Sequence, residues 1–270
     1  FIGSEGTLGL ICEATLQLTR PQTDTTVMVL GIETFAAIVA VLEAFKTKIE
    51  LTAFEFFSQA ALDKVISRQG HSAPFATQAP FYALVEFETS PAVTDVALTL
   101  FEQCAAQGWV LDGVVSQSLA QARALWRLRE DISQTLWHWQ PYKNDISVRV
   151  SKMPAFLAEV DQLVAARYPD FEIVWYGHIG DGNLHLNILK PKALTQPEFF
   201  ERCGAVSHEI GELLARYGGS ISAEHGVGLL KKSLLPYSRS PTEIALMRSI
   251  RKTFDPKSIL NPGKVFDFLA

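Results

Sequence analysis

The stretch that organises this chain reads Tyr176-Gly-His178-Ile-Gly-Asp-Gly-Asn-Leu-His185-Leu-Asn187. An Asp-Gly pair between two runs of strand-forming residues is typical of a β-hairpin with a two-residue turn. A turn centred on that pair places His178 opposite His185. Because side chains alternate along a strand, both imidazoles then share one face with Tyr176 and Asn187. The other face is apolar and consists of Ile173, Trp175, Ile179, Leu184, Leu186 and Ile188.

This register indicates a metal site. Opposed residues of an antiparallel pair have Cβ atoms roughly 5 Å apart, so both rings could ligate one ion at about 2.0–2.1 Å. A second cluster, Ser222-Ala-Glu224-His225-Gly226-Val-Gly228, adds a carboxylate and a third imidazole in a glycine-flanked loop. Two histidines and a carboxylate with open positions are typical of a catalytic metal site. The alternative is a polar strand surface without an ion, and the hairpin alone leaves both interpretations open.

Composition bounds the class of protein. The 270 residues are 48% hydrophobic and 20% charged, as in a folded globular chain with room for a substantial core. A net charge of −5 without a long Lys/Arg run argues against nucleic acid as a partner. Three scattered cysteines, Cys12, Cys104 and Cys203, favour reduced thiols in a cytoplasmic protein over a disulfide framework.

The pattern of apolar runs predicts two successive β-α-β units. Strands are expected over 26–32, 51–56, 81–88 and 109–116, with helices over 35–48, 58–67 and 92–107. Such units predict an α+β fold with a ferredoxin-like antiparallel sheet and helices on one face. Further helices are expected over 119–138, 154–167, 197–217 and 242–254, and a further strand over 145–150.

Two more groups of residues suggest ligands. Arg127 and Arg129, with Lys143, offer cations for a carboxylate, and Ser133 lies one helical turn from Arg129. The alternative for this group is a solvated helix with internal Arg–Glu pairs. The opening segment 3–9 is glycine-rich, and its amides could lie against a pyrophosphate or a flavin, or simply form a tight turn.

Four motifs occur together and in order: Gly3-Ser-Glu-Gly-Thr-Leu-Gly9, Gly177-His-Ile-Gly-Asp-Gly-Asn-Leu-His185, Ala223-Glu-His-Gly226 and Leu260-Asn-Pro-Gly-Lys264. This set resembles the FAD-linked 2-hydroxyacid dehydrogenases, which include D-2-hydroxyglutarate dehydrogenase, D-lactate dehydrogenase and the glycolate oxidase flavin subunit. The resemblance implies a C-terminal part whose N-terminal FAD-binding domain is missing. Residues 1–22 would be the last segment of that truncated domain, 23–254 a cap and substrate domain, and 255–270 a tail returning toward the flavin.

The resemblance also implies a role for particular residues. A divalent metal, zinc as first choice, would be held by His178, His185 and Glu224. The general base would be His225. Substrate would be bound by Arg129, Ser133, Lys143 and Asn187. The FAD would be touched by Gly6, Thr7, Gly9 and Asn261. Ser133 stands where the family has threonine, and its spacing to Lys143 is one residue shorter, so the individual 2-hydroxyacid stays open.

The implied activity is oxidation of a D-2-hydroxyacid to a 2-oxoacid by hydride transfer to FAD. A separate electron acceptor and a homodimer are further expectations about partners. We expect the 270-residue polypeptide alone to bind no FAD tightly and to be inactive. Two alternatives remain, a zinc-dependent hydrolase built on the same ligands and a non-catalytic metal- or acid-binding module.

Overall fold

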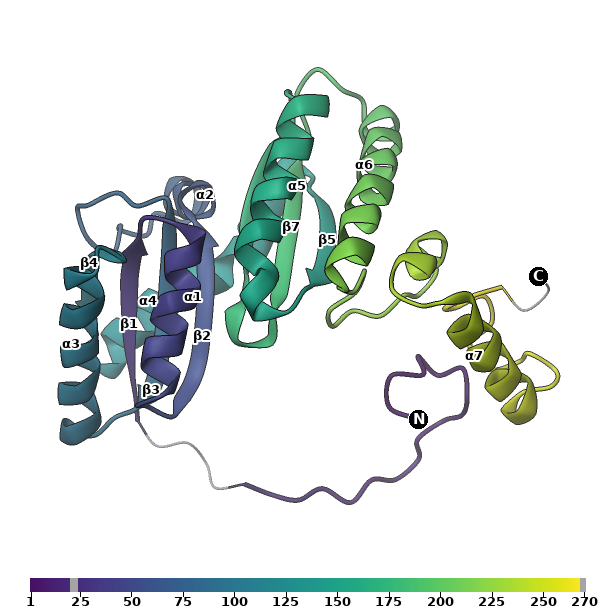
Figure 1. Cartoon of the computed structure of the whole chain (residues 1–270), viewed down its shortest axis with the longest axis horizontal. Helices are drawn as coiled ribbons and strands as arrows, with labels where there is room; N and C mark the ends of the chain where they lie inside the picture. The colour runs from purple at the N-terminus through teal and green to yellow at the C-terminus, as the bar shows by residue number, and fades with distance from the viewer. Residues whose placement is uncertain (20–23, 268–270) are drawn as a thin grey trace.

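The computed structural model describes residues 1–19 and 24–267. A seven-stranded sheet runs through the described residues in the order β4-β1-β3-β2-β6-β7-β5 (Figure 1). Each neighbouring pair is antiparallel. The strands are β1 Thr25–Ile32, β2 Leu51–Ser58, β3 Phe81–Glu88, β4 Val110–Val115, β5 Tyr142–Ser147, β6 Glu172–His178 and β7 Asn183–Leu189. The order of the first four strands is that of a ferredoxin-like sheet, so the expected fold class is confirmed.

The helices are close to their expected positions. They are α1 Phe35–Lys46, α2 Gln59–Gln69, α3 Pro91–Ala106, α4 Leu119–Leu136, α5 Met153–Arg167, α6 Gln196–Tyr217 and α7 Pro241–Phe254. Most of these helices start after a Ser or Thr whose side chain accepts a backbone N–H of the first turn, as Thr34 does for α1 and Ser118 for α4. Within the described ranges, no helix is both long and apolar enough to cross a membrane.

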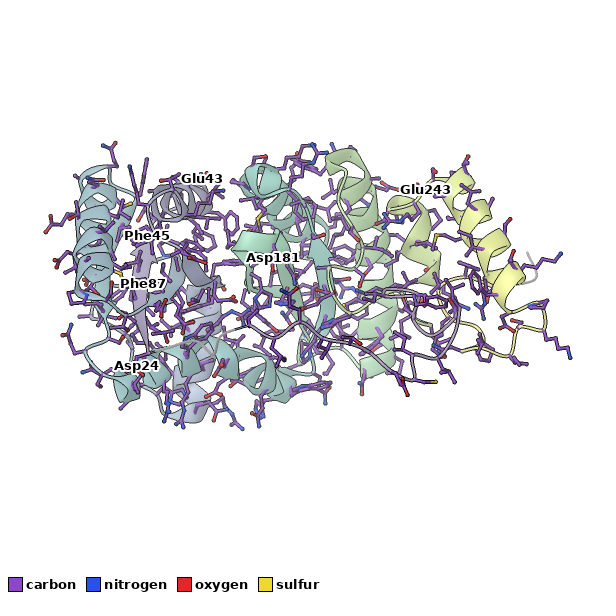
Figure 2. All side chains as sticks on the ribbon, turned by 90° about the horizontal axis from the view of Figure 1, so that it is seen from below. Asp24, Glu43, Phe45, Phe87, Asp181 and Glu243 are labelled. Carbon is purple, nitrogen blue, oxygen red and sulfur yellow. The ribbon has the colours of Figure 1, made fainter. Side chains whose placement is uncertain are left out.

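Helices cover both faces of the sheet, so the expectation of helices on one face is wrong. Val27 and Val29 of β1 pack in a core with residues of α2 and α4, whereas Met28 and Leu30 pack in a second core with residues of α1, α3, α5 and α6. Because β1 is apolar at successive positions, both of its faces need cover. Figure 2 shows the exposed Glu43 on the outside of α1, while Phe45 of the same helix is buried.

The first residues of the chain and the described segment after α7 both lie beside α7 (Figure 1). Phe1 packs edge-to-face on Phe254, with ring centroids 5.6 Å apart. The buried Arg251 donates to the carbonyl oxygens of Leu260 and Lys264, which shapes the tail after α7. The expected boundary between 22 and 23 and the end of the tail, 268–270, lie outside the described residues.

Candidate functional site

The histidine hairpin consists of β6 and β7, but its register differs from the expected one. His178 pairs with Asn183, and Tyr176 pairs with His185. Residues 179–182 form a longer turn, in which Gly182 has φ +71° and lies so near Val148 that a Cβ would come within 2.2 Å of its carbonyl oxygen. The expected pairing was therefore wrong by two residues. A shift by two preserves the face, so both imidazoles still lie together, with ring centroids 5.2 Å apart.

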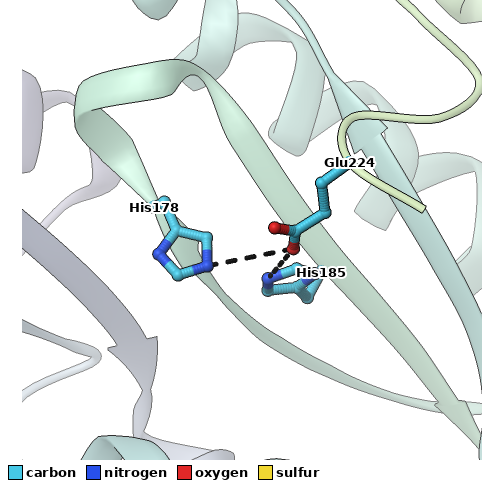
Figure 3. Close-up of side chains that lie close together, drawn as sticks. All are labelled: His178, His185 and Glu224. Atoms are coloured by element: carbon cyan, nitrogen blue, oxygen red, sulfur yellow. Dashed lines mark ion pairs between the residues drawn. The ribbon is translucent and has the colours of Figure 1, made fainter. Parts of the chain in front are cut away.

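Glu224 reaches this pair from a loop after α6 (Figure 3). Its Oε1 lies 3.5 Å from His185 Nε2 and 4.0 Å from His178 Nε2. One ligand atom from each of the three residues lies within 4.8 Å of the other two. Two imidazole nitrogens and one carboxylate oxygen are donors that zinc accepts, so the residues present fit a divalent ion.

Each histidine faces a buried carboxylate on the strand that flanks the hairpin on its side, which is β2 for His178 and β5 for His185. Glu55 of β2 is in register with His178, and Asp145 of β5 is in register with His185. The Glu55 Oε1 to His178 Nδ1 distance is 2.8 Å, and the Asp145 Oδ1 to His185 Nδ1 distance is 3.7 Å. Both Nδ1 atoms therefore face the supporting strands, while both Nε2 atoms face Glu224.

The same surroundings set the protonation of the two rings. The hydrogen bond with Glu55 raises the pKa of His178 above its usual value. Burial, with the nearby Arg129 and His178 charges, lowers the pKa of His185 to about 3. His185 is thus neutral at physiological pH, which is the form that binds a metal.

Asp145 also anchors the loop that carries Glu224. Its Oδ2 accepts the backbone N–H groups of Ala223 at 3.1 Å, Glu224 at 3.0 Å and His225 at 3.0 Å. Burial alone would raise the pKa of Asp145, but the N–H groups of Glu224 and His225 and the nearby charges of Lys231 and His225 together lower it. His225 itself is two-thirds exposed, at 67%, so its ring lies at the open side of the site.

A cavity of about 300 Å³ joins these residues to the expected substrate-binding groups. The guanidinium of Arg129 is buried, forms an ion pair with Glu55 at 2.8 Å and lies 4.7 Å above the Tyr176 ring. Lys143 donates to the Ser133 hydroxyl at 3.0 Å. The cavity is lined by Arg129, Ser133, Lys143, Asn144, Asp145, Tyr176, His178, His185, Asn187, Glu224, His225 and Lys231.

Arg127 and Arg129, expected to act together, lie on different faces of α4. Arg129 is buried in the cavity wall, whereas Arg127 is exposed and does not line the cavity, so the solvated-helix interpretation holds for Arg127 alone. Asn187 is 1% exposed, and its Oδ1 has no hydrogen-bond partner among the described residues. A buried acceptor without a partner in the wall of a cavity is available to a ligand.

The residues expected to touch a flavin lie beside the loop that carries Glu224 rather than in the cavity lining. Asn261 donates its side-chain N–H to the Glu5 carbonyl, and a Cβ on Gly6 would be 3.7 Å from Asn261. Thr7 is buried, and Gly9 lies against the Phe1 ring. The Glu5 carboxylate accepts the N–H groups of Val227 at 2.6 Å and Gly228 at 2.7 Å, which fastens this segment to the loop just after His225.

Sequence reasoning missed four of these residues. Glu55 had a signal, because it is a lone charge in the apolar run Ala53-Phe-Glu-Phe-Phe57. Asp145 and Glu5 had none. Lys231 is half-buried and donates to the Asp145 carbonyl at 3.2 Å, and nothing in its local sequence indicates this contact.

Residues 21–265 match the family described as FAD linked oxidases, C-terminal domain. The chain belongs to this family. D-2-hydroxyglutarate dehydrogenase of Stutzerimonas stutzeri is 58% identical over 267 residues, and the enzyme of that name from Xanthomonas citri pv. viticola is 52% identical over the same length. Each match covers 98% of this chain but only 58% and 56% of the relative. This FAD-linked oxidase domain therefore spans little more than half the length of these relatives.

Solved structures agree with this membership at the level of fold. Substrate-bound p-cresol methylhydroxylase superposes with a TM-score of 0.65 at 14% identity, over 92% of this chain and 54% of that one. The 4-ethylphenol oxidase of Gulosibacter chungangensis has a TM-score of 0.63 at 13% identity, over 93% and 55%. The resemblance to FAD-linked dehydrogenases drawn from the four motifs is confirmed.

Proposed function

We propose that this chain is the metal- and substrate-binding part of a flavin-dependent dehydrogenase that oxidises a D-2-hydroxyacid to a 2-oxoacid. The observation that carries the proposal is the cavity in which a three-residue ligand cluster, a further imidazole and three cations, Arg129, Lys143 and Lys231, meet. Relatives that match 98% of the chain and are named D-2-hydroxyglutarate dehydrogenase support it. In the whole protein, residues 1–22 would end an FAD-binding domain, 23–254 would form the cap and 255–270 would return toward the flavin.

A divalent ion, zinc as first choice, would be held by His178, His185 and Glu224. When bound, such an ion supplies Lewis-acid polarisation of the substrate hydroxyl, and FAD supplies the acceptor for the hydride. Gly6, Thr7, Gly9 and Asn261 would contribute the side of the flavin site nearest the loop. A separate electron acceptor would be needed to complete the reaction.

The chain's own residues orient the substrate and move its proton. Arg129 and Lys143 bind carboxylate, since guanidinium and ammonium groups make the stronger, charge-assisted hydrogen bonds. Asn187 presents a side-chain carbonyl oxygen for which the described part of the chain offers no hydrogen-bond partner. His225, at the open side beside Glu224, accepts the hydroxyl proton as hydride leaves Cα. The alcohol thus loses a hydride and a proton, which together are two electrons and two protons, and becomes a ketone.

The cations favour a diacid within this class. Lys143 lies with Ser133 and the Trp137 ring, 4.7 Å from the ring centroid, whereas Arg129 lies with Glu55 and Tyr176 beside His178. Two separate positive groups suit two carboxylates. We therefore propose D-2-hydroxyglutarate as the first substrate to test.

The test is anaerobic flavin reduction in the flavin-loaded protein that contains this chain, with zinc restored. D-2-hydroxyglutarate should bleach the flavin and its L enantiomer should not. His225→Ala should slow reduction by about 10²–10⁴, the usual contribution of a general base, without changing zinc affinity. If no D-2-hydroxyacid reduced the flavin, or if His225→Ala reduced it at the parent rate, the proposed reaction or the proposed base would be wrong.

A further inference from the structure

Glu55 is a buried charge in the middle of β2. The residue is 7% exposed and lies between Phe54 and Phe56 along the strand. Taking a carboxylate out of water is costly unless charges or hydrogen bonds compensate it. Glu55 is compensated by two groups, and both of them line the candidate site.

The first partner is a ligand of the proposed ion. Glu55 Oε1 lies 2.8 Å from His178 Nδ1. A second interaction on one ring nitrogen fixes the orientation of an imidazole and leaves the other nitrogen for a metal. Here the remaining atom is His178 Nε2, which faces Glu224 Oε1 at 4.0 Å.

The second partner is the buried arginine. Glu55 Oε2 lies 2.8 Å from Arg129 Nη2, and the guanidinium is also stacked above the Tyr176 ring. These two contacts hold the guanidinium in the cavity wall. Removing the carboxylate would leave Arg129 as a buried cation without its counter-charge, which is a larger loss than that of one contact.

We propose that Glu55 is a positioning residue that links the proposed metal site, through its ligand His178, to the carboxylate-binding Arg129. One carboxylate thereby orients both the imidazole and the guanidinium. The inference rests on the proposed function. Three elements meet at this point: β2 supplies the carboxylate, β6 the imidazole and α4 the guanidinium. Losing Glu55 should therefore weaken the binding of zinc and of substrate in the same variant.

Glu55→Gln and Glu55→Ala test this link. Zinc affinity is measured by chelator competition on the purified chain, and KM for D-2-hydroxyglutarate is measured on the flavin-loaded protein. We expect zinc affinity to fall by about 10- to 100-fold, the usual effect of losing an outer-sphere partner, together with a rise in KM. In long-range ¹H–¹⁵N spectra of the metal-free Glu55→Ala chain, His178 should lose the single tautomer that the carboxylate selects.

Glu86→Gln is the matched control. Glu86 lies on the adjacent strand β3 and accepts hydrogen bonds from Thr25, Thr52 and Trp126, none of which lines the cavity. It should change stability but neither zinc affinity nor KM. Glu55→Gln preserves side-chain volume, so it decides the question if Glu55→Ala fails to fold.

The link is wrong if the Glu55 variants match the parent in zinc affinity, or if only one of the two affinities falls. A parent that turned over no D-2-hydroxyacid would instead refute the proposed function. The zinc titration of parent and variants would then still decide whether Glu55 supports the proposed metal site.

Discussion

The Oδ2 atom of Asp145 accepts the backbone N–H of Glu224 at 3.0 Å, so a buried strand residue fixes the loop residue that offers the third ligand. The neighbouring N–H groups of Ala223 and His225 converge on the same oxygen. The proposed ligand Glu224 and the proposed base His225 are therefore both held by Asp145. The anchor acts mainly through the backbone, although the Nδ1 atom of His225 also lies 3.6 Å from the same oxygen. Both Glu224 and His225 line the cavity.

Asp145→Asn should loosen that loop. An amide keeps one acceptor oxygen but loses the charge that strengthens three converging hydrogen bonds. We expect faster hydrogen exchange at the amides of 223–225 and a loss of zinc affinity of about 10- to 100-fold. Asp112→Asn is the control, because Asp112 accepts from Gly113 and Thr77 away from the cavity. Unchanged exchange at 223–225 would contradict the anchoring role.

The proposed ligands should be visible as metal-dependent stability. Zinc at about 100 times its Kd should stabilise the parent chain by roughly 2.7 kcal/mol, and a chelator should remove this gain. His185→Ala and Glu224→Gln should abolish it. His208→Ala should retain it, because His208 lies on α6 and contacts Tyr237 instead. Thermal unfolding with and without zinc measures the difference. If zinc stabilised His185→Ala or Glu224→Gln as much as the parent, the proposed metal site would be wrong.

Lys143 should discriminate diacids from monoacids. Losing a hydrogen bond to a charged group costs about 1.5–3 kcal/mol, or roughly 10- to 100-fold in KM. Lys143→Gln should raise KM for D-2-hydroxyglutarate by that factor and leave KM for D-lactate, which has one carboxylate, nearly unchanged. Lys192→Gln removes an exposed lysine and controls for net charge. Equal effects on both acids would place Lys143 on the carboxylate that they share.

Cys203 should make the fold less stable at alkaline pH. Burial raises the pKa of this thiol from 9.0 to about 12. Between these values the unfolded chain releases the thiol proton while the folded chain retains it, so the free energy of unfolding falls as pH rises above 9.0. Urea unfolding of Cys203→Ala should show a shallower alkaline decline than the parent. Parallel declines would show that Cys203 does not titrate in this way.

The sequence predicted the strands and helices well because their apolar periodicity is strong, yet it predicted the hairpin register wrongly. The Asp-Gly pair indicates a two-residue turn, whereas close contact of Gly182 with Val148 accompanies a longer one. The shared face of His178 and His185 survived this error because a shift by two residues keeps side-chain parity. The alternation of side chains along a strand therefore predicts which face of the sheet a residue occupies more reliably than it predicts the residue opposite it on the neighbouring strand.

Supporting carboxylates were harder to predict than the residues they support. Glu55 is 123 positions from His178, and Asp145 is 79 positions from Glu224. No local spacing encodes such contacts, since they depend on which strands become neighbours in the sheet. The motifs indicated the groups facing the cavity, and the tertiary fold supplied the groups behind them.

The junction between β2 and β6 has a consequence for how the protein assembles. It is the seam between the four N-terminal strands and the three that include the hairpin, and Glu55 reaches across it to His178. Contacts so distant in sequence form late, because closing the chain over them is entropically unfavourable. The proposed zinc site therefore gains the support of Glu55 only once the two blocks of the sheet have docked. We expect the rise to full zinc affinity during refolding to report this docking step.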